Sequence, residues 1–275
     1  MRTGPHSAIA GFGMDTITLA GPLEAKLEAM AEAGFSQVML KANDLVGHPG
    51  GVAAAVRAVR NSGLRGTGFQ VLRDFEGLSG HLHQYKVDIA KSMLEMCAAL
   101  DCKVLLAVPL GIKIAFEGLS WGRTINEYTT AWDVVCRADC PNLGLGIDAY
   151  HIFAAKTPLD EIDYLDPSKI FLVQLADFMW QEVATFEERR TTARTFRVFP
   201  GEGVHTDEMV DLVLRLDRLG YRGDYSFEVF NDDYVNLPLP MVVERAKRSA
   251  LWLAEDVLRR SVPLPNQLRL KERLA

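Results

Sequence analysis

Short apolar runs alternate with longer amphipathic segments along almost the whole of this 275-residue chain. The runs are four to six residues long and rich in Ile, Val, Leu and Phe, which is typical of strands that helices cover on both faces. Eight runs follow one another in this way: Ser7–Phe12, Gln37–Leu40, Arg65–Gln70, Lys103–Ala107, Lys113–Glu117, Gly144–Asp148, Ile170–Leu175 and Asp224–Glu228. The alternation predicts a parallel sheet of the α/β class, and eight such strands predict a closed (β/α)8 TIM barrel.

The segments between the runs have helical spacing. In the first of them Leu23, Leu27 and Met30 fall on one face of a helix. Later helices are expected at Tyr128–Ala138, Met209–Leu219 and Met241–Leu258. No low-complexity block or Pro/Ser-rich linker divides the chain, so we expect a single domain over residues 1–275, with a C-terminal tail from Arg259 to Ala275.

One connection is too short for this fold. Only four residues, Val-Pro-Leu-Gly, separate Ala107 from Ile112, whereas parallel neighbours need a crossover of about a dozen residues, usually a helix. Either the two runs form an antiparallel hairpin, or this sequence lacks a crossover helix between the fourth and fifth strands. We favour the second interpretation because Val-Pro-Leu-Gly is typical of a helix end with its terminal glycine.

Charge and hydropathy narrow the class of function. The net charge is −6, which disfavours a nucleic-acid partner because phosphate binding needs a basic surface. No apolar stretch approaches the ~20 residues that span a bilayer, and the first residues lack a signal-peptide profile. We therefore expect a cytoplasmic protein that acts on a small molecule. The tail either packs on a second copy, as in a homo-oligomer, or is loose.

Polar side chains follow the last four strands at the point where each strand ends. They are Glu117, Asp148, Gln174 and Glu228. The carboxyl ends of barrel strands meet at one mouth, and three carboxylates crowded there would repel one another without a cation. Oxygen ligands of this kind suit Mg²⁺, Mn²⁺ or a similar divalent ion. The sequence therefore predicts a metal site, although any one of these side chains alone would be read as a solvated acid or a helix cap.

Three more residues are candidates for the same mouth. His151 follows Asp148 by three residues, which favours proton transfer over the commoner fate of a lone core histidine. Arg73 follows the third strand and either holds a substrate carboxylate or pairs with a neighbouring loop acid. Arg197 lies next to the turn that ends the long connection 178–203, and we expect it to bind substrate.

These residues lie in segments that resemble the xylose-isomerase-like barrel superfamily, and within it most closely the bacterial 3-dehydroshikimate dehydratases. The segments that carry the resemblance are Phe69–Gly77, Ala115–Arg123, Gly144–His151, Val173–Asp177, Phe196–Gly203 and Ser226–Asp232. That family also has a longer connection where this chain has four residues. The second strand and the segment from Trp180 to Arg194 depart from the family pattern, and both lie where substrate choice is made.

The resemblance implies a divalent metal at the positions of Glu117, Asp148, Gln174 and Glu228. It also implies that His151 lies near the reacting carbon and that Arg73 and Arg197 surround the substrate. The expected activity is a metal-dependent lyase that dehydrates a cyclic hydroxy-keto acid, 3-dehydroshikimate, to protocatechuate.

Two alternatives remain open. In a sugar or polyol isomerase or epimerase, Glu117 and Glu228 would exchange a proton on opposite sides of one carbon. A non-catalytic barrel would bind a metal or a small ligand without turnover, but the strand-end acids and His151 serve no obvious scaffold need.

Overall fold

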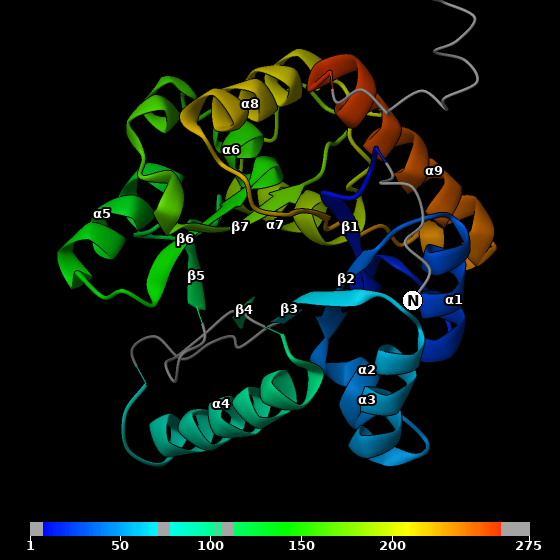
Figure 1. Ribbon diagram of the computed structural model, residues 1–275. Helices are drawn as coiled ribbons and strands as arrows, with labels where there is room; N and C mark the ends of the chain where they lie inside the picture. Colours follow the sequence, from blue (N-terminus) through cyan, green and yellow to red (C-terminus); the bar gives the residue numbers. More distant parts are fainter. Residues whose placement is uncertain (1–7, 71–77, 103, 106–112, 260–275) are drawn as a thin grey trace, which may run out of the picture.

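The computed structural model describes residues 8–70, 78–102, 104–105 and 113–259. Eight parallel strands form a closed barrel in sequence order, with β8 pairing back onto β1, and helices surround it (Figure 1). The strands are β1 (Phe12–Asp15), β2 (Gln37–Lys41), β3 (Arg65–Gln70), β4 (Val104–Leu105), β5 (Lys113–Glu117), β6 (Leu143–Asp148), β7 (Ile170–Leu175) and β8 (Tyr225–Phe227). The (β/α)8 barrel predicted from the strand–helix alternation is confirmed.

Most helices run along the outside of this barrel. They are α1 (Leu23–Glu32), α2 (Ala42–Val46), α3 (Gly51–Asn61), α4 (Gly80–Leu100), α5 (Tyr128–Ala138), α6 (Ala149–Ala155), α7 (Phe186–Thr195), α8 (Thr206–Leu219) and α9 (Leu239–Leu251), which continues as a π-helical segment (Trp252–Val257). None of the helices in the described ranges combines the length and the apolarity that a bilayer crossing requires.

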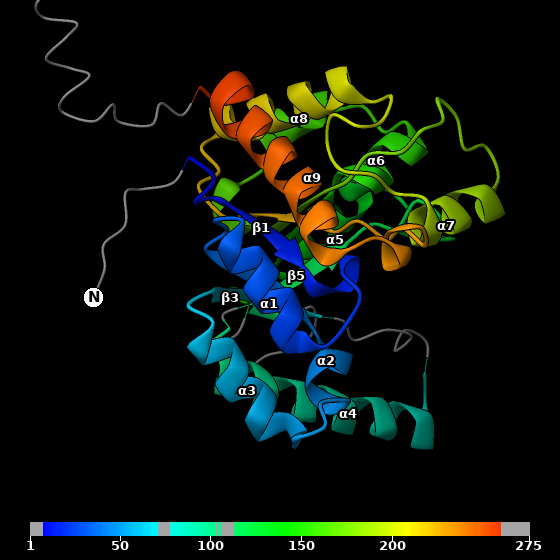
Figure 2. The same ribbon diagram turned by 90° about the vertical axis from the view of Figure 1, so that its right-hand side faces the viewer.

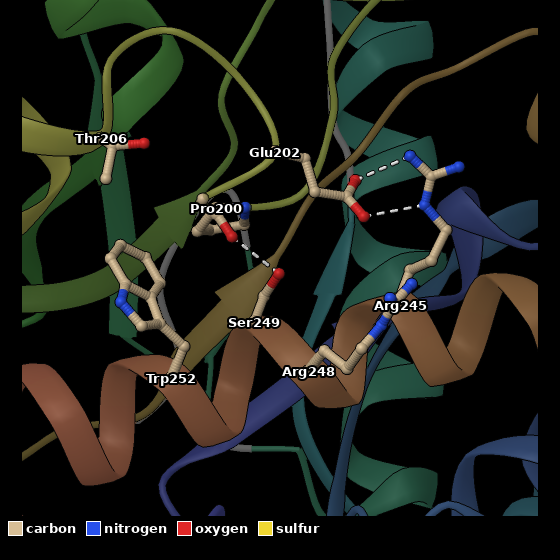
Figure 3. A pocket seen from close by; sticks show the side chains of 8 residues that line it. Pro200, Glu202, Thr206, Arg245, Arg248, Ser249 and Trp252 are labelled. Carbon is tan, nitrogen blue, oxygen red and sulfur yellow. Dashed lines mark hydrogen bonds and ion pairs between the residues drawn. The ribbon is translucent and has the colours of Figure 1, made fainter.

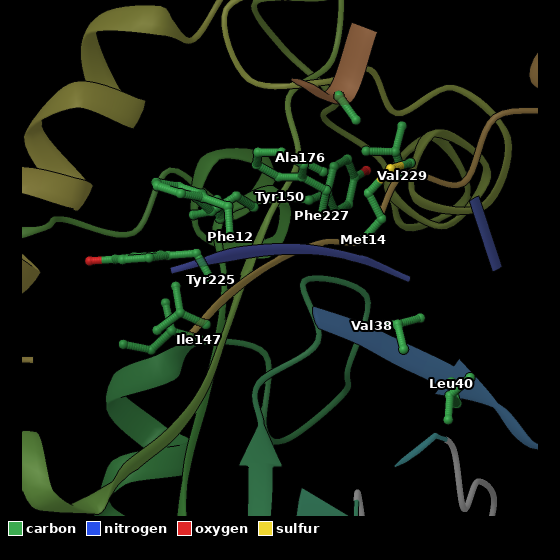
Figure 4. Packing of buried hydrophobic residues seen from close by; sticks show 14 of the residues in the cluster. Phe12, Met14, Val38, Leu40, Ile147, Tyr150, Ala176, Tyr225, Phe227 and Val229 are labelled. Atoms are coloured by element: carbon green, nitrogen blue, oxygen red, sulfur yellow. The ribbon is translucent and has the colours of Figure 1, made fainter. Parts of the chain in front are cut away.

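Side chains alternate between the inside and the outside of the barrel, as the pleat of a strand requires. Met39, Ala115 and Leu172 come from β2, β5 and β7, yet they form one small buried cluster, which only the barrel interior can bring together. The outward-facing side chains pack against the helices instead. There the ring of Phe12 stacks on that of Tyr225, with centroids 5.3 Å apart, and Phe227 completes the contact (Figure 4).

Apart from the N-terminus, the strand ends in the described residues lie within one residue of the predicted limits, and residues 103, 106 and 107 of the predicted fourth strand lie outside the described residues. The run expected at 7–12 is wrong as a strand: β1 begins only at Phe12 and continues to Asp15. Residues 8–11 are instead a turn, in which Ile9 O accepts the backbone N–H of Phe12 at 2.9 Å. Ile9 is apolar because it is buried at the barrel end, so its hydrophobicity reflected burial and not strand pairing.

The structure tests one of the two interpretations of the short connection between the fourth and fifth strands. β4 and β5 are parallel, with Val104 opposite Lys113 and Leu105 opposite Ile114, so the antiparallel hairpin is excluded. Residues 106–112 lie outside the described residues, and the absence of a crossover helix from this sequence therefore stays a prediction. The tail at 260–275 also lies outside the described residues.

Gly144 on β6 is a point where the barrel admits no side chain. A Cβ at this position would lie 2.4 Å from the backbone oxygen of Lys169 and 2.6 Å from the ring of Phe171. We expect Gly144→Ala to lower the free energy of unfolding by about 1–3 kcal/mol, because backbone must move to make room. Gly146→Ala is the matched control on the same strand, since its Cβ would meet side-chain atoms only at 3.4–3.5 Å. Urea denaturation of both variants measures the difference, and equal losses would contradict this account of β6.

Candidate metal centre

The C-terminal end of the barrel carries a layer of inward-facing polar side chains. Each of these residues lies two positions after a residue of the same strand whose side chain faces the barrel interior. Because successive side chains of a strand point to opposite faces, the residue two positions later also faces inward. The layer consists of Asp15 on β1, Lys41 on β2, Gln70 on β3, Glu117 on β5, Asp148 on β6, Gln174 on β7 and Glu228, which directly follows β8. Strand ends far apart in the sequence thus gather four acids at one place.

Three residues of this region come within metal-binding reach of one another. Glu117, Asp148 and His151 each offer a ligand atom, and these atoms all lie within 4.8 Å of one another. The imidazole Nε2 of His151 is 3.5 Å from Glu117 Oε1 and 3.6 Å from Asp148 Oδ2. Asp148 is held in place because its Oδ1 accepts the backbone N–H of Tyr150 at 2.9 Å and so caps α6.

His151 is presented to the carboxylates by the first turn of α6. Its Nδ1 lies 3.3 Å from the backbone N of Ser120, which donates, and 3.0 Å from the Ser120 hydroxyl. Trp121 and Tyr150 pack their rings edge-on against the imidazole. Burial lowers the pKa of His151 to about 3, although the Asp148 carboxylate acts in the opposite direction. The imidazole is therefore neutral at physiological pH and able to accept a proton or bind a metal.

Arg197 lies among the carboxylates and is fully engaged with the protein. Its Nη1 is 2.7 Å from Asp148 Oδ2 and 3.2 Å from Glu228 Oε2, while its Nε donates to Ala193 O at 2.8 Å. Burial acts to lower its pKa, but Asp148 and Glu228 outweigh burial and raise it. The guanidinium also lies 4.5 Å from the ring centroid of Tyr150. Its predicted role in substrate binding stays a prediction.

The remaining predicted site residues fall into two groups. Gln174 is buried in the same layer, in register with Asp148 on β6 and Ser226 on β8, and Glu228 is joined to Asp148 through Arg197. The assignment of Gln174 and Glu228 as metal ligands remains a prediction. Arg73 lies outside the described residues.

Asp15 is a member of the polar layer that the sequence analysis missed. It is fully buried at the end of β1, where its Oδ1 accepts the backbone N–H of Ile17 and its Oδ2 has no hydrogen-bond partner among the described residues. Burial raises the pKa of this carboxyl, and the nearby Glu228 raises it further. The signal was present as an acid at a strand end, but the misplaced first strand concealed it.

The connection between β7 and α8 covers this end of the barrel. It contains α7, whose start is fixed by a capping box between Thr185 and Glu188, and α7 projects beyond the strand ends (Figure 2). Arg189 on α7 reaches the backbone oxygens of Val183 and Ser120, and its own carbonyl accepts the Tyr150 hydroxyl at 2.6 Å. Arg189 thereby ties this helix to the residues around His151.

A second set of hydrogen bonds holds the outer side of the connection between β7 and α8. Glu202 accepts two hydrogen bonds from Arg245 on α9, at 2.8 and 2.9 Å, and the Ser249 hydroxyl donates to Pro200 O at 2.7 Å (Figure 3). A pocket of about 320 Å³ opens beside these contacts, between the start of α8 and α9. None of the residues around His151 lines this pocket, so we assign it to the packing of α9 against the connection and not to the candidate metal centre.

The donor set fits a divalent cation. Three acids (Glu117, Asp148 and Glu228) and one neutral imidazole converge in a region from which solvent is largely excluded, and buried carboxylates require a compensating positive charge. Arg197 supplies one such charge. The three carboxylates carry more negative charge than the Arg197 guanidinium neutralises, and a bound divalent cation would neutralise the excess.

Binding of a metal here should stabilise the fold. At a hundredfold excess of Mn²⁺ or Zn²⁺ over its Kd, we expect about 2.7 kcal/mol of stabilisation, which corresponds to about 5–10 °C in Tm. Glu117→Gln should abolish most of this increase, and Glu208→Gln, on the exposed first turn of α8, should preserve it. Differential scanning calorimetry measures the shift, and an increase that survives Glu117→Gln would argue against this ligand assignment.

Replacement of Arg197 should lower the free energy of unfolding, because the buried carboxylates lose the positive charge that compensates them. In the metal-free protein, Arg197→Met leaves Asp148 and Glu228 without their cation, so we expect a loss of about 3–5 kcal/mol in the free energy of unfolding. Arg190→Met removes an exposed ion pair with Glu187 and should cost less than about 1 kcal/mol. Guanidinium denaturation compares the two, and similar small losses would show that the buried pairs are not needed for stability.

Comparison with known proteins places this geometry in a family. Residues 106–255 match the family described as xylose isomerase-like TIM barrel. The 3-dehydroshikimate dehydratase of Pseudomonas putida KT2440 is 31% identical over 88% of this chain, and that of Pseudomonas aeruginosa PAO1 is 34% identical over 90%. The alignments cover 41% and 43% of those proteins, so the chain spans less than half the length of these relatives.

Solved structures agree with the fold. A xylose isomerase-like TIM barrel/4-hydroxyphenylpyruvate dioxygenase fusion protein superposes with a TM-score of 0.80 at 30% identity, over 96% of this chain and 44% of the other. An IolI protein with a bound zinc atom superposes with a TM-score of 0.76 at 20% identity, over 90% of this chain and 99% of the other. From the family match, the dehydratase relatives and the barrel itself, we conclude that this chain belongs to the xylose isomerase-like TIM barrel family.

Proposed function

We propose that this protein is a divalent-metal-dependent dehydratase that converts 3-dehydroshikimate to protocatechuate and water. The observation that carries the proposal is the convergence of Glu117, Asp148 and His151 within 4.8 Å at the C-terminal end of the barrel. The two Pseudomonas relatives named as 3-dehydroshikimate dehydratases support the choice of reaction. A small-molecule substrate suits a reaction centre built on strand ends beneath a covering connection.

The ion would be held by Glu117 and Asp148, with Gln174 and Glu228 completing the oxygen ligands. When bound, a divalent ion polarises a carbonyl oxygen and stabilises the negative charge that develops on it. Arg197 fixes the position of Asp148 and Glu228 through its contacts at 2.7 and 3.2 Å. The IolI structure, which has the same fold, is described with a bound zinc atom, and this supports a divalent metal in a barrel of this kind.

His151 is the base in this proposal. Its pKa of about 3 keeps the imidazole neutral. In the tautomer that leaves Nε2 unprotonated, Nε2 accepts the proton from the carbon next to the substrate carbonyl, and the Nδ1–H donates a hydrogen bond to the Ser120 hydroxyl, 3.0 Å away, in place of accepting the Ser120 backbone N–H. The imidazolium that forms is stabilised by Glu117 and Asp148 at 3.5 and 3.6 Å. It then returns the proton to the departing hydroxyl, and water leaves with the C–O bonding pair.

A sugar or polyol isomerase is the second candidate. Relatives named inosose isomerase support it, among them one from Bacillus subtilis that is 26% identical over 60% of this chain and 56% of that protein. In that case Glu117 and Glu228 would exchange the proton between opposite faces of a substrate carbon. Both acids face inward at the same end of the barrel, so the geometry is compatible with this chemistry. The identity and the coverage are lower than for the dehydratases.

An activity assay distinguishes the dehydratase from the isomerase. We expect Mn²⁺-loaded protein to convert 3-dehydroshikimate with the growth of protocatechuate absorbance in the ultraviolet. His151→Asn should lower kcat by about 10²–10⁴-fold, because it removes the proton acceptor. His81→Asn, on the exposed first turn of α4, is the matched control and should be as active as the wild type. No absorbance growth, together with deuterium exchange into an inosose in D₂O, would replace the dehydratase with the isomerase.

A further inference from the structure

The β2–β3 side of the barrel end, across from Glu117 and Asp148 on β5 and β6, carries two polar residues without an assigned role. Lys41 ends β2 and Gln70 ends β3, and the two are register partners on adjacent strands. Both face inward: Met39, two residues before Lys41, belongs to the interior cluster, and a Cβ on Gly68, two residues before Gln70, would touch the Met39 side chain at 3.5 Å. Adjacent strands are about 4.8 Å apart, so these side chains rise next to each other.

The ammonium of Lys41 has no ion pair or hydrogen bond within the described ranges. Only its backbone N–H is used, in a bond to the Thr16 hydroxyl at 3.0 Å. Arg197, a buried cation of this end, is by contrast held by Asp148 and Glu228. Lys26, the buried lysine nearest in the sequence, is held by Asp44 at 2.8 Å. Lys41 is therefore a cation at the reaction centre with its charge available to a ligand.

Gln70 adds a second available donor. Its side chain is 1% exposed, and its amide Nε2 has no hydrogen-bond partner among the described residues. A buried N–H donor without an acceptor is costly and is rare in native proteins. An acceptor oxygen brought by a ligand would satisfy it, and the adjacent Lys41 ammonium would favour an oxygen that carries negative charge.

We propose that Lys41 and Gln70 bind the carboxylate of the substrate and orient its ring toward Glu117, Asp148 and His151. This inference rests on the proposed function, because it assigns one end of a hydroxy-keto acid to the β2–β3 side and the reacting carbons to the β5–β6 side. The charge distribution supports this orientation, since Glu117, Asp148 and Glu228 would repel a carboxylate from their side. Lys41 and Gln70 thereby determine specificity for an acid over a neutral polyol.

The test uses a matched pair of unreactive ligands. Shikimate carries the carboxylate but lacks the carbonyl of the substrate, and methyl shikimate has the same ring without the charge. Isothermal titration of Mn²⁺-loaded protein should show that Lys41→Met weakens shikimate binding on the order of tenfold to a hundredfold. Methyl shikimate should bind the wild type and Lys41→Met equally. Gln70→Leu should weaken shikimate binding as well, by a smaller factor.

Two control variants separate charge from structure. Lys41→Arg keeps the positive charge and should retain most of the shikimate affinity. Lys113→Met removes a lysine from the opposite end of the barrel, where its ammonium lies 4.5 Å from the Phe171 ring centroid, and should leave the affinity unchanged. Circular dichroism confirms that each variant is folded.

The outcomes distinguish this inference from the proposed function. If shikimate binding depends on Lys41 but 3-dehydroshikimate is not converted, the carboxylate subsite stands and the dehydratase assignment fails. If 3-dehydroshikimate is converted and Lys41→Met leaves both the KM and the shikimate affinity unchanged, the carboxylate lies elsewhere and the inference is overturned. A wild-type protein that does not distinguish shikimate from methyl shikimate would also overturn it.

Discussion

The crowding of buried carboxylates at the C-terminal end of the barrel is the constraint on which the rest of this protein depends. Asp148 and Glu228 approach each other closely enough for one guanidinium, that of Arg197, to contact both. Such an arrangement is stable only while positive charge compensates it, because water is largely excluded. Arg197 is one source of that charge and the proposed divalent metal would be the second. The proposed chemistry would use the same field to stabilise a proton on His151 and negative charge on the substrate.

The connection that covers this end is joined by hydrogen bonds to the candidate metal centre. Arg189 links α7 to the Ser120 carbonyl, and the Ser120 backbone and hydroxyl set the orientation of His151. Tyr150 stands between them, with its hydroxyl bound to Arg189 and its ring against Arg197. The covering helix is therefore linked through these contacts to His151, the proton acceptor in the proposed mechanism.

Much of the fold was predictable because each strand of a barrel carries its own local signal. β3, β5 and β7 begin and end where the apolar runs predicted. β1 did not, because Ile9 is buried by the turn that precedes the strand and has the same hydrophobicity as a strand residue. That error of a few residues also concealed Asp15, since a strand-end acid is recognised only when the strand end is placed correctly.

The sequence by itself determined the barrel and the chemical types at its strand ends, because alternation and strand length are local properties of the chain. It placed Glu117, Asp148 and His151 together through the rule that parallel strands end at one mouth. Only the tertiary structure decided that Arg197 lies between carboxylates and that Lys41 stands beside Gln70, with no side-chain partner for the Lys41 ammonium or the Gln70 Nε2 in the described part of the chain. Charge pairing depends on distances across the barrel, and no spacing along a single strand encodes them.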